Sequence, residues 1–337
     1  MKFTAISLLS LSFLVQAYVM VIVVWFASWL VVGDANWVLV LLNRAGVYLF
    51  LPIPFLLVLS LIQRHIKLVY WLLAPIAVFL GLYNPYFLPK NTSYRSDYYT
   101  LSVMTYNVLY SNKDYDAVAS AILKNYSDLV ALQEVQPEMM EELQKRLQKE
   151  FPYSILGNEN DYGTTAVFSR FPFVDSYVLD LQADRPAVVV TVEVPGGTVA
   201  FVSAHLLAYN LWRTELEDIP TTVMERTYTQ NRQANIILNE IKSKTEIVVM
   251  GCDCNSYETS SSYRILDEML DNSARTVEWL AAITSPVGAN RDLALDHIDF
   301  VWYKGNLTSV GTYKIFADGG SDHIPILATF VINVETK

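Results

Sequence analysis

The first quarter of the chain is built from long apolar runs separated by very short polar breaks. Residues 5–32 form one uncharged apolar run, longer than the roughly 20 residues with which a helix spans a bilayer. A second run covers 37–62, with a short polar break, and a third covers 68–83 and contains Pro75. A cleaved signal peptide has an apolar region of only about 7–15 residues, so the first run predicts a retained helix. We expect about three transmembrane helices within 1–84; two crossings plus a re-entrant segment is the competing interpretation.

The few charges in the short loops predict an orientation. Lys2 precedes the first run, and Arg64 and Lys67 lie between the second and the third, whereas Asp34 is the only charge between the first two. The positive-inside rule places the basic segments in the cytoplasm. With three crossings, everything after residue 84 is then expected on the extracytoplasmic side of the membrane.

Beyond the apolar runs the pattern changes to short apolar strands and amphipathic helices. The polar stretch 85–97, which contains two prolines, is the expected linker, and 98–337 is long enough for one large globular domain. A strand within 100–110 is expected to end at Asn107, and one within 127–135 at Glu134. Further strands are expected at 163–172, 187–194, 198–206, 246–250, 296–303 and 324–332, and helices at 114–125, 137–150 and 225–242.

The charge of the chain disfavours one class of ligand. The formal net charge is −10, and the acidic excess lies entirely beyond residue 97, because the residues before it hold more basic than acidic side chains. Non-specific DNA binding depends on neutralising phosphates with basic residues. An acidic domain of this kind therefore argues against nucleic acid as the substrate.

Polar side chains gather where the predicted strands end. Carboxylates and amides supply the oxygen ligands that Mg²⁺ takes, and a neutral histidine can accept a proton from water. This combination suits metal-assisted phosphoryl chemistry. In chain order these residues are Asn107, Glu134, His205, Asp253, Asn255, Asp296, Asp322 and His323.

Six short blocks at these positions resemble, in order, the signature sequences of the endonuclease/exonuclease/phosphatase superfamily. They read TYNVLY, LQEV, SAHL, GCDCN, LDHIDFV and SDHIPI, and the resemblance covers about residues 100–332. The superfamily includes deoxyribonucleases, abasic-site endonucleases, sphingomyelinases and inositol-polyphosphate phosphatases. The resemblance implies an α/β fold, a two-sheet sandwich with four αββα layers, preceded here by the transmembrane region. It also implies a site formed by strand-end loops.

The resemblance further implies which residues hold the metal. Glu134 would ligate Mg²⁺, or Mn²⁺ in its place. Asp322 would help to bind the metal directly or through water. Asn107 would lie nearby and orient the phosphate or a metal-bound water.

Catalytic and substrate-binding roles follow from the same blocks. His205 would hydrogen-bond the phosphate or protonate the leaving oxygen, and Asn255 would hold a phosphate oxygen. Asp253 would orient the attacking water. His323 would act as general base or transition-state stabiliser, with its ring oriented by Asp296. His297, next to Asp296, would face away and be structural.

Both cysteines of the chain lie in GCDCN, where the superfamily has Gly-Asp-x-Asn. In an extended segment successive side chains point to opposite faces, so Asp253 and Asn255 share one face and Cys252 and Cys254 the other. Two sulfurs without further partners make a poor zinc site, and a disulfide across so short a loop would be strained. We therefore expect the cysteines to be small buried residues on the packing side.

These observations favour a membrane-anchored, metal-dependent phosphoesterase that hydrolyses phosphodiester or phosphomonoester bonds. The membrane region and the acidic domain favour a lipid or lipid-linked substrate over nucleic acid. A nuclease acting on extracytoplasmic nucleic acid and a non-catalytic phospho-ligand-binding domain are the alternatives. Every expected metal and histidine position holds a competent residue, which argues against the non-catalytic alternative. No protein partner can be inferred.

Overall fold

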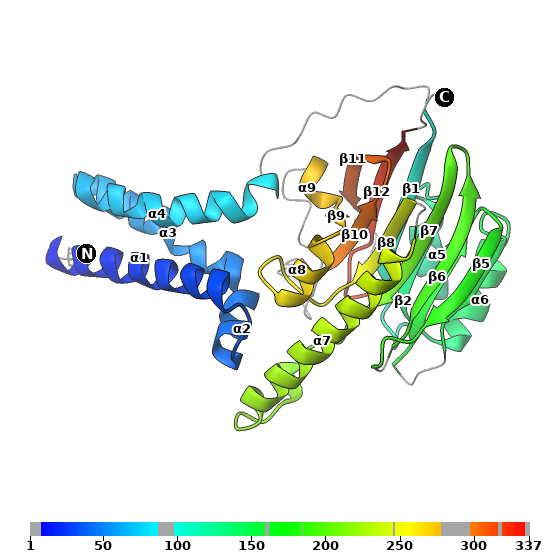
Figure 1. Ribbon diagram of the computed structural model, residues 1–337, viewed down its shortest axis with the longest axis horizontal. Coiled ribbons are helices and arrows are strands. Elements are labelled where there is room, and N and C mark those ends of the chain that lie inside the picture. The colour runs from blue at the N-terminus through cyan, green and yellow to red at the C-terminus, as the bar shows by residue number, and fades with distance from the viewer. Residues whose placement is uncertain are drawn as a thin grey trace. The chain divides into compact units, whose positions relative to one another are not determined.

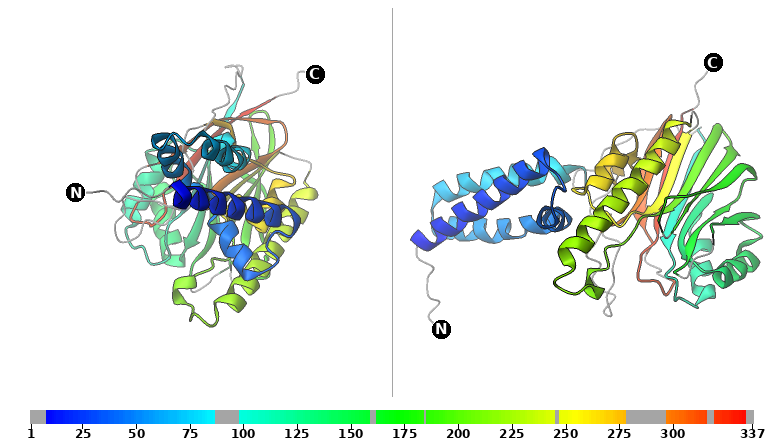
Figure 2. Two further views of the ribbon diagram at one scale, coloured as in Figure 1. Left: turned by 90° about the vertical axis from the view of Figure 1, so that its left-hand side faces the viewer. Right: turned by 60° about the horizontal axis from the view of Figure 1, so that its bottom comes forward.

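The computed structural model divides the chain into two compact units. The first comprises residues 1–85 with 211–224 and 259–261, and the second comprises the rest. Figures 1 and 2 show the helical elements of the first unit and the two sheets of the second. The structure describes residues 8–86, 98–158, 162–183, 185–244, 247–277, 297–315 and 319–333, so most of the expected linker lies outside the described residues.

The first unit contains the apolar runs. Two of its described helices are long and apolar enough to cross a membrane, and α2 with the segment from Gly46 to Ile62 forms a pair bent by 72°. There are thus two candidate spans, or three if the bent pair is one span, and both interpretations of the sequence stay open. α4 continues through Pro75. The helices are α1 (Leu8–Val31), α2 (Trp37–Arg44), η1 (Gly46–Phe50), α3 (Pro52–Ile62), α4 (Ile66–Tyr83) and η2 (Asn84–Tyr86).

Asn43, near the break between α2 and η1, explains how a polar residue is accommodated among apolar helices. Its side chain is fully buried, accepts a hydrogen bond from Trp25 Nε1 at 3.0 Å and donates to Asp34 Oδ1 at 2.7 Å. A buried amide costs free energy unless such partners exist. The side-chain amide of Asn43, which interrupts the second apolar run, therefore has its hydrogen-bond partners inside the unit.

The second unit contains two six-stranded sheets (Figure 1). In the first sheet the order is β11 (Leu307–Lys314), β12 (Ile326–Ile332), β1 (Thr100–Asn107), β2 (Leu129–Val135), β4 (Thr164–Ser169) and β3 (Tyr153–Leu156). In the second sheet the order is β5 (Phe173–Leu179), β6 (Ala187–Val194), β7 (Gly197–His205), β8 (Ile247–Asp253), β10 (Asp299–Lys304) and β9 (Asp271–Asn272).

Each sheet contains one parallel pair, and its other pairs are antiparallel. β1 pairs in parallel with β2 in the first sheet, and β7 pairs in parallel with β8 in the second. The carboxyl ends of parallel strands meet at one edge of a sheet, where sites commonly form. The topology therefore brings the ends of β1, β2, β7 and β8 to two neighbouring edges.

Helices cover the outer faces of both sheets, which gives the expected αββα layers (Figure 2). α5 (Tyr115–Leu123) and α6 (Pro137–Leu147) pack on the first sheet, and α7 (Ile219–Lys242) and α8 (Ser261–Asp267) on the second. Apolar side chains of both sheets, such as Val103 and Val249, form the central core. The short elements η3 (Leu211–Arg213) and α9 (Ala274–Val277) complete the described helices.

The two sheets approach each other closely at Gly251. A Cβ at this position would lie 2.6 Å from the Cβ of Ala131 and 2.9 Å from the Cβ of Thr105, both in the opposite sheet. Only glycine fits such a close approach. Because Gly251 faces the other sheet, Asp253, two residues further along β8, faces it as well.

Candidate active site

The period-two alternation of four strands aims four polar side chains into the space between the sheets. In β1, Leu101 and Val103 face the central core, and Asn107 lies on the same side. The same alternation places His205 of β7, Asp253 of β8 and Asp299 of β10 on the inner side. All four are buried. The site thus forms between the sheets, where β1, β7 and β8 end and β10 begins.

One oxygen of Asp253 is the point at which these groups converge. Oδ2 accepts a hydrogen bond from Asn107 Nδ2 at 2.8 Å and lies 3.3 Å from His205 Nε2. The other oxygen, Oδ1, accepts from the backbone N–H of Asn255 at 3.2 Å. The side-chain Nδ2 of Asn255 lies 3.1 Å from His205 Nε2. The structure therefore brings together the expected residues from β1, β7 and β8.

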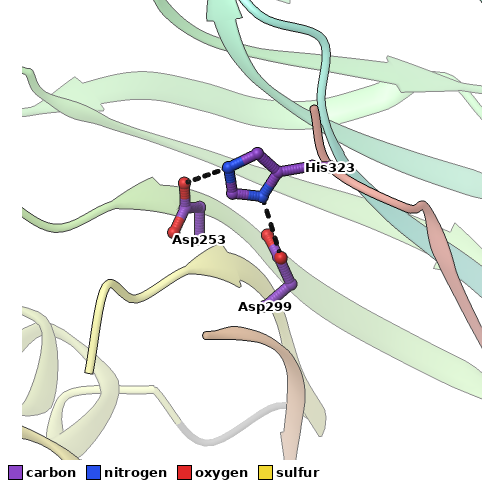
Figure 3. A group of neighbouring side chains, drawn as sticks. All are labelled: Asp253, Asp299 and His323. Carbon is purple, nitrogen blue, oxygen red and sulfur yellow. Dashed lines mark hydrogen bonds and ion pairs between the residues drawn. The ribbon is translucent and has the colours of Figure 1, made fainter. Parts of the chain in front are cut away.

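His323 completes this group from the opposite side (Figure 3). Its Nε2 lies 3.8 Å from Asp253 Oδ2, and its Nδ1 lies 2.9 Å from Asp299 Oδ2. The backbone is fixed as well, since Ser321 Oγ accepts from the N–H of His323 at 3.0 Å and donates to the carbonyl of Asn107 at 2.6 Å. The ring is thus held between two carboxylates.

The carboxylate that contacts the ring of His323 is that of Asp299. The LDHIDFV block implied Asp296, which lies outside the described residues, and the block contains a second aspartate three positions later. Asp299 is opposite Asp253 in the β8–β10 register, and Val301 on the same face lies in the central core. Alternation along β10 was the signal that distinguishes the two aspartates. His297 contacts Glu258, at 2.9 Å, and the ring of Phe300.

Glu134 reaches the site through a break in the alternation of β2. The register between β2 and β4 shifts between Leu132 and Val135, and Glu134 has a φ of 61°. Such a bulge redirects a side chain that regular pleating would place on the outer face. Gly163 packs against this backbone, and a Cβ there would lie 2.4 Å from the carbonyl carbon of Glu134. The redirected Oε2 accepts the N–H of Tyr110 at 3.1 Å.

Arg185, to which the sequence analysis gave no role, lies beside Glu134. Its Nη2 is 3.3 Å from Glu134 Oε1, and its Nη1 is 3.0 Å from Nδ1 and 2.9 Å from Nε2 of His205. Arg185 precedes the apolar strand β6 by two residues, in a segment without a local pattern. A lone basic residue next to a buried strand was the only signal available from the sequence.

Two glutamines of α7 hold the loops that carry His205 and Asn255. Gln230 Nε2 donates to the carbonyls of Leu207 at 2.6 Å and Asn255 at 2.9 Å, and Gln233 Oε1 accepts the N–H of Leu207 at 2.9 Å. Both glutamines are buried. Two uncharged polar residues on the buried face of an amphipathic helix indicate such a positioning role.

The protonation of the three titratable groups differs because their surroundings differ. Burial and the nearby Arg185 hold the pKa of His205 well below its usual value, so its contact with Asp253 involves a neutral ring. Burial and the charge of Asp299 raise the pKa of Asp253 to about 7. Burial by itself would lower the pKa of His323, but Asp299 and Asp253 outweigh it and raise that pKa to about 10.

The donor set of the site fits a hard divalent cation. Glu134 and Asp322 carry carboxylate oxygens. Oδ1 of Asp322 is buried without a partner among the described residues, which fits an oxygen that binds a cation. Asp253, Asp299 and His323 form a second candidate group, whose ligand atoms lie within 4.8 Å of one another. Asn107 is placed less favourably as a metal ligand, because its Oδ1 accepts a hydrogen bond from the N–H of Leu109 at 3.0 Å.

The two cysteines lie on the face opposite Asp253, as alternation predicts, but they are not free thiols. Both are fully buried in the cluster between the second sheet and α7, and they form a disulfide with a Cα–Cα distance of 5.1 Å. The expectation of unpaired cysteines is therefore wrong. β8 ends at Asp253, and the two Cα atoms on either side of this residue lie within the usual range for a disulfide.

We expect the Cys252→Ala/Cys254→Ala double variant to lose about 1–3 kcal/mol of unfolding free energy, because a short cross-link and buried sulfur atoms are removed. Most phosphoesterase activity should remain, since neither sulfur faces the site. Denaturant unfolding of the full chain in detergent measures the first effect. Alkylation of the denatured wild-type chain should add mass only after reduction; labelling without a reductant would contradict the pairing.

The chain matches the model of the Endonuclease/Exonuclease/phosphatase family over residues 104–323. It therefore belongs to this family, whose members hydrolyse phosphoester bonds. No curated protein matches the chain.

Several solved structures share the fold of the second unit. A humanized D. rerio TDP2 with 14 mutations covers 68% of this chain and 98% of its own, with a TM-score of 0.56 and 19% identity. An endonuclease/exonuclease/phosphatase from Beutenbergia cavernae DSM 12333 covers 69% of this chain and 72% of its own, with a TM-score of 0.56 and 20% identity. D. rerio TDP2 complexed with a single strand DNA product covers 68% and 98%, with a TM-score of 0.55 and 17% identity. At these identities the likeness establishes the fold.

Proposed function

We propose that the protein is a membrane-anchored phosphoesterase that uses Mg²⁺, or Mn²⁺ in its place, to hydrolyse a lipid or lipid-linked phosphoester on the extracytoplasmic side. The observation that carries the proposal is the group of nitrogens around one oxygen of Asp253. Oδ2 is approached by the amide of Asn107 and by the rings of His205 and His323. This arrangement suits a phosphoryl group with a water beside it.

Each side chain has a role that its geometry permits. His205 and Asn255, which touch each other, bind phosphate oxygens, and Asp253 orients the attacking water. His323, held by Asp299, is protonated at neutral pH because its pKa is raised, so it can donate a proton or stabilise the charge that develops on the phosphoryl group. Action as a general base would require the neutral ring.

Glu134 and Asp322 would hold the divalent cation, with Asn107 nearby. When bound, the cation supplies Lewis-acid polarisation of the phosphoryl oxygen. The bulge at Glu134 and the buried oxygen of Asp322 support this assignment, because the bulge redirects the Glu134 carboxylate and Oδ1 of Asp322 has no partner among the described residues.

Three observations support the expected location and substrate. The first unit has two or three candidate membrane spans, and basic residues flank them on the side expected to be cytoplasmic. The disulfide between Cys252 and Cys254 is typical of an oxidising compartment. The acidic excess beyond residue 97 disfavours nucleic acid, and proximity to a bilayer favours a lipid phosphoester.

The test of the function is a hydrolysis screen of the full chain in detergent with Mg²⁺. Vesicles of phospholipid and sphingomyelin, single-stranded DNA and soluble phosphomonoesters are the substrates, and chelation by EDTA is the control. We expect the highest turnover on a lipid phosphoester. Preferred cleavage of DNA would support the nuclease alternative, and phosphate binding without turnover on any substrate would support a non-catalytic domain.

Protease digestion tests the orientation. An extracellular protease added to intact cells or spheroplasts should remove the second unit, since three crossings would place it outside the cytoplasm. A cytoplasmic marker should remain intact in the same sample. If the unit is digested only after lysis, the predicted orientation is wrong.

A further inference from the structure

The side chain of Arg185 is placed as a component of the site rather than as a surface charge. It is only 16% exposed, and the Glu134 side chain beside it is 14% exposed. Nη2 also donates to the carbonyl of Tyr162 at 3.2 Å, which fixes the plane of the guanidinium. A charge this buried needs a partner, and Glu134 is the carboxylate that neutralises it.

Other donors of the guanidinium are directed to the same region. Nη1 lies within 3.0 Å of both ring nitrogens of His205, and Nε is buried without a partner among the described residues. His205 in turn lies 3.1 Å from Nδ2 of Asn255. Nitrogen groups of three residues therefore adjoin one another beside Asp253.

Such a cluster suits the oxygens of a phosphate. Guanidinium offers five N–H donors in a planar fork that matches phosphate geometry, and its hydrogen bonds to an anion are charge-assisted. The same positive charge disfavours a divalent cation at Glu134, because like charges at this distance repel. Arg185 can thus strengthen the binding of phosphate and weaken the binding of a divalent cation.

We propose that Arg185 binds a phosphate oxygen of the substrate together with His205 and Asn255, and that it weakens the binding of a divalent cation at Glu134. The inference rests on the proposed phosphoesterase function. It adds to that function a cationic residue that limits metal affinity and contributes to phosphate affinity.

Two binding measurements on the full chain in detergent test the proposal. Electron paramagnetic resonance gives the dissociation constant of Mn²⁺, and calorimetry gives that of inorganic phosphate at saturating Mg²⁺. In Arg185→Gln we expect Mn²⁺ to bind about tenfold more tightly. Inorganic phosphate should bind about 10- to 100-fold more weakly. A variant that merely misfolds would bind both Mn²⁺ and inorganic phosphate more weakly.

Arg170→Gln is the matched control. Arg170 is 24% exposed, its Nη1 is 2.8 Å from Glu150, and its Nε donates to the carbonyl of Ser127. It therefore resembles Arg185 in burial, in its ion pair and in its carbonyl contact. Its loss should change thermal stability and leave the affinities for Mn²⁺ and phosphate unchanged. Arg185→Lys, which keeps the charge without the fork, should retain the weak Mn²⁺ binding and lose part of the phosphate affinity.

The outcomes separate this inference from the proposed function. If the wild-type chain binds neither Mn²⁺ nor phosphate, the phosphoesterase proposal itself fails. If the wild type binds both and Arg185→Gln leaves either affinity unchanged, or weakens both, Arg185 does not have the role proposed here.

Discussion

His323→Ala is expected to lower turnover on the preferred substrate by about 10²–10⁴-fold, the usual contribution of a proton-transferring group. The ring lies between Asp299 and Asp253, and Ser321 fixes its backbone, so its removal takes away the imidazole that joins the two carboxylates. Mg²⁺ affinity and folding should change little. Steady-state turnover at several Mg²⁺ concentrations, together with thermal unfolding, measures these quantities.

His297→Asn is the control for this prediction. His297 is also buried and also lies 2.9 Å from a carboxylate, that of Glu258. Its loss should affect stability and leave turnover near the wild-type value. If His323→Ala retains near-wild-type turnover, or if both histidine variants lose it equally, the mechanism is wrong.

Two aspartate variants separate the candidates for the orienting carboxylate. Asp299→Asn should fall between the wild type and His323→Ala, because it removes the charge that supports the ring but keeps its hydrogen-bonding shape. Asp296→Asn should have the smaller effect. The reverse order would restore the role that the sequence analysis gave to Asp296.

Glu134→Gln is expected to reduce turnover at least as much as His323→Ala, on the order of 10³-fold at low Mg²⁺, because a carboxylate ligand of the cation is lost. Raising the concentration of Mg²⁺ or Mn²⁺ should restore part of the activity. No such rescue is expected for His323→Ala, since its defect does not involve metal binding. Turnover as a function of metal concentration distinguishes the two.

Glu150→Gln serves as the matched control for Glu134. Glu150 is paired with Arg170 at 2.8 Å, as Glu134 is with Arg185 at 3.3 Å. Its replacement should not change the dependence of turnover on Mg²⁺. A metal-independent loss in Glu134→Gln would show that Glu134 does not act through the cation.

The sequence predicted the sheets well where strands are buried and poorly where they are exposed. β1, β2, β6, β7 and β8 carry apolar runs that reveal them. β5 has no fully buried residue, and in β11 apolar residues are interspersed with polar ones, so neither strand was expected. α7 begins at Ile219, several residues before the expected start. Apolar periodicity records burial, and edge strands and exposed helix ends lack it.

The site residues on regular strands could be predicted from the sequence, whereas those that depend on irregular backbone could not. Alternation predicts that Asp253 lies on the inner face, and the same rule applied to β10 would have found Asp299. Asn255 follows the end of β8 with a φ of 45°, so alternation does not account for its position. Glu134 reaches the site through a bulge, which alternation does not foresee. Arg185 meets Glu134 only because the two sheets pack together, and no local pattern encodes that contact.

The pairing of β1 with β12 determines when the site can appear during folding. Thr105 lies opposite Ile326, so a strand near the beginning of the second unit pairs with one near its end. His323 immediately precedes β12, whereas Asn107 ends β1. Contacts this distant in sequence form late, and domains of this size commonly pass through partly folded intermediates. A ribosome-bound chain that has not yet released β12 should therefore be unable to cleave substrate, which delays activity until synthesis has passed Ile332.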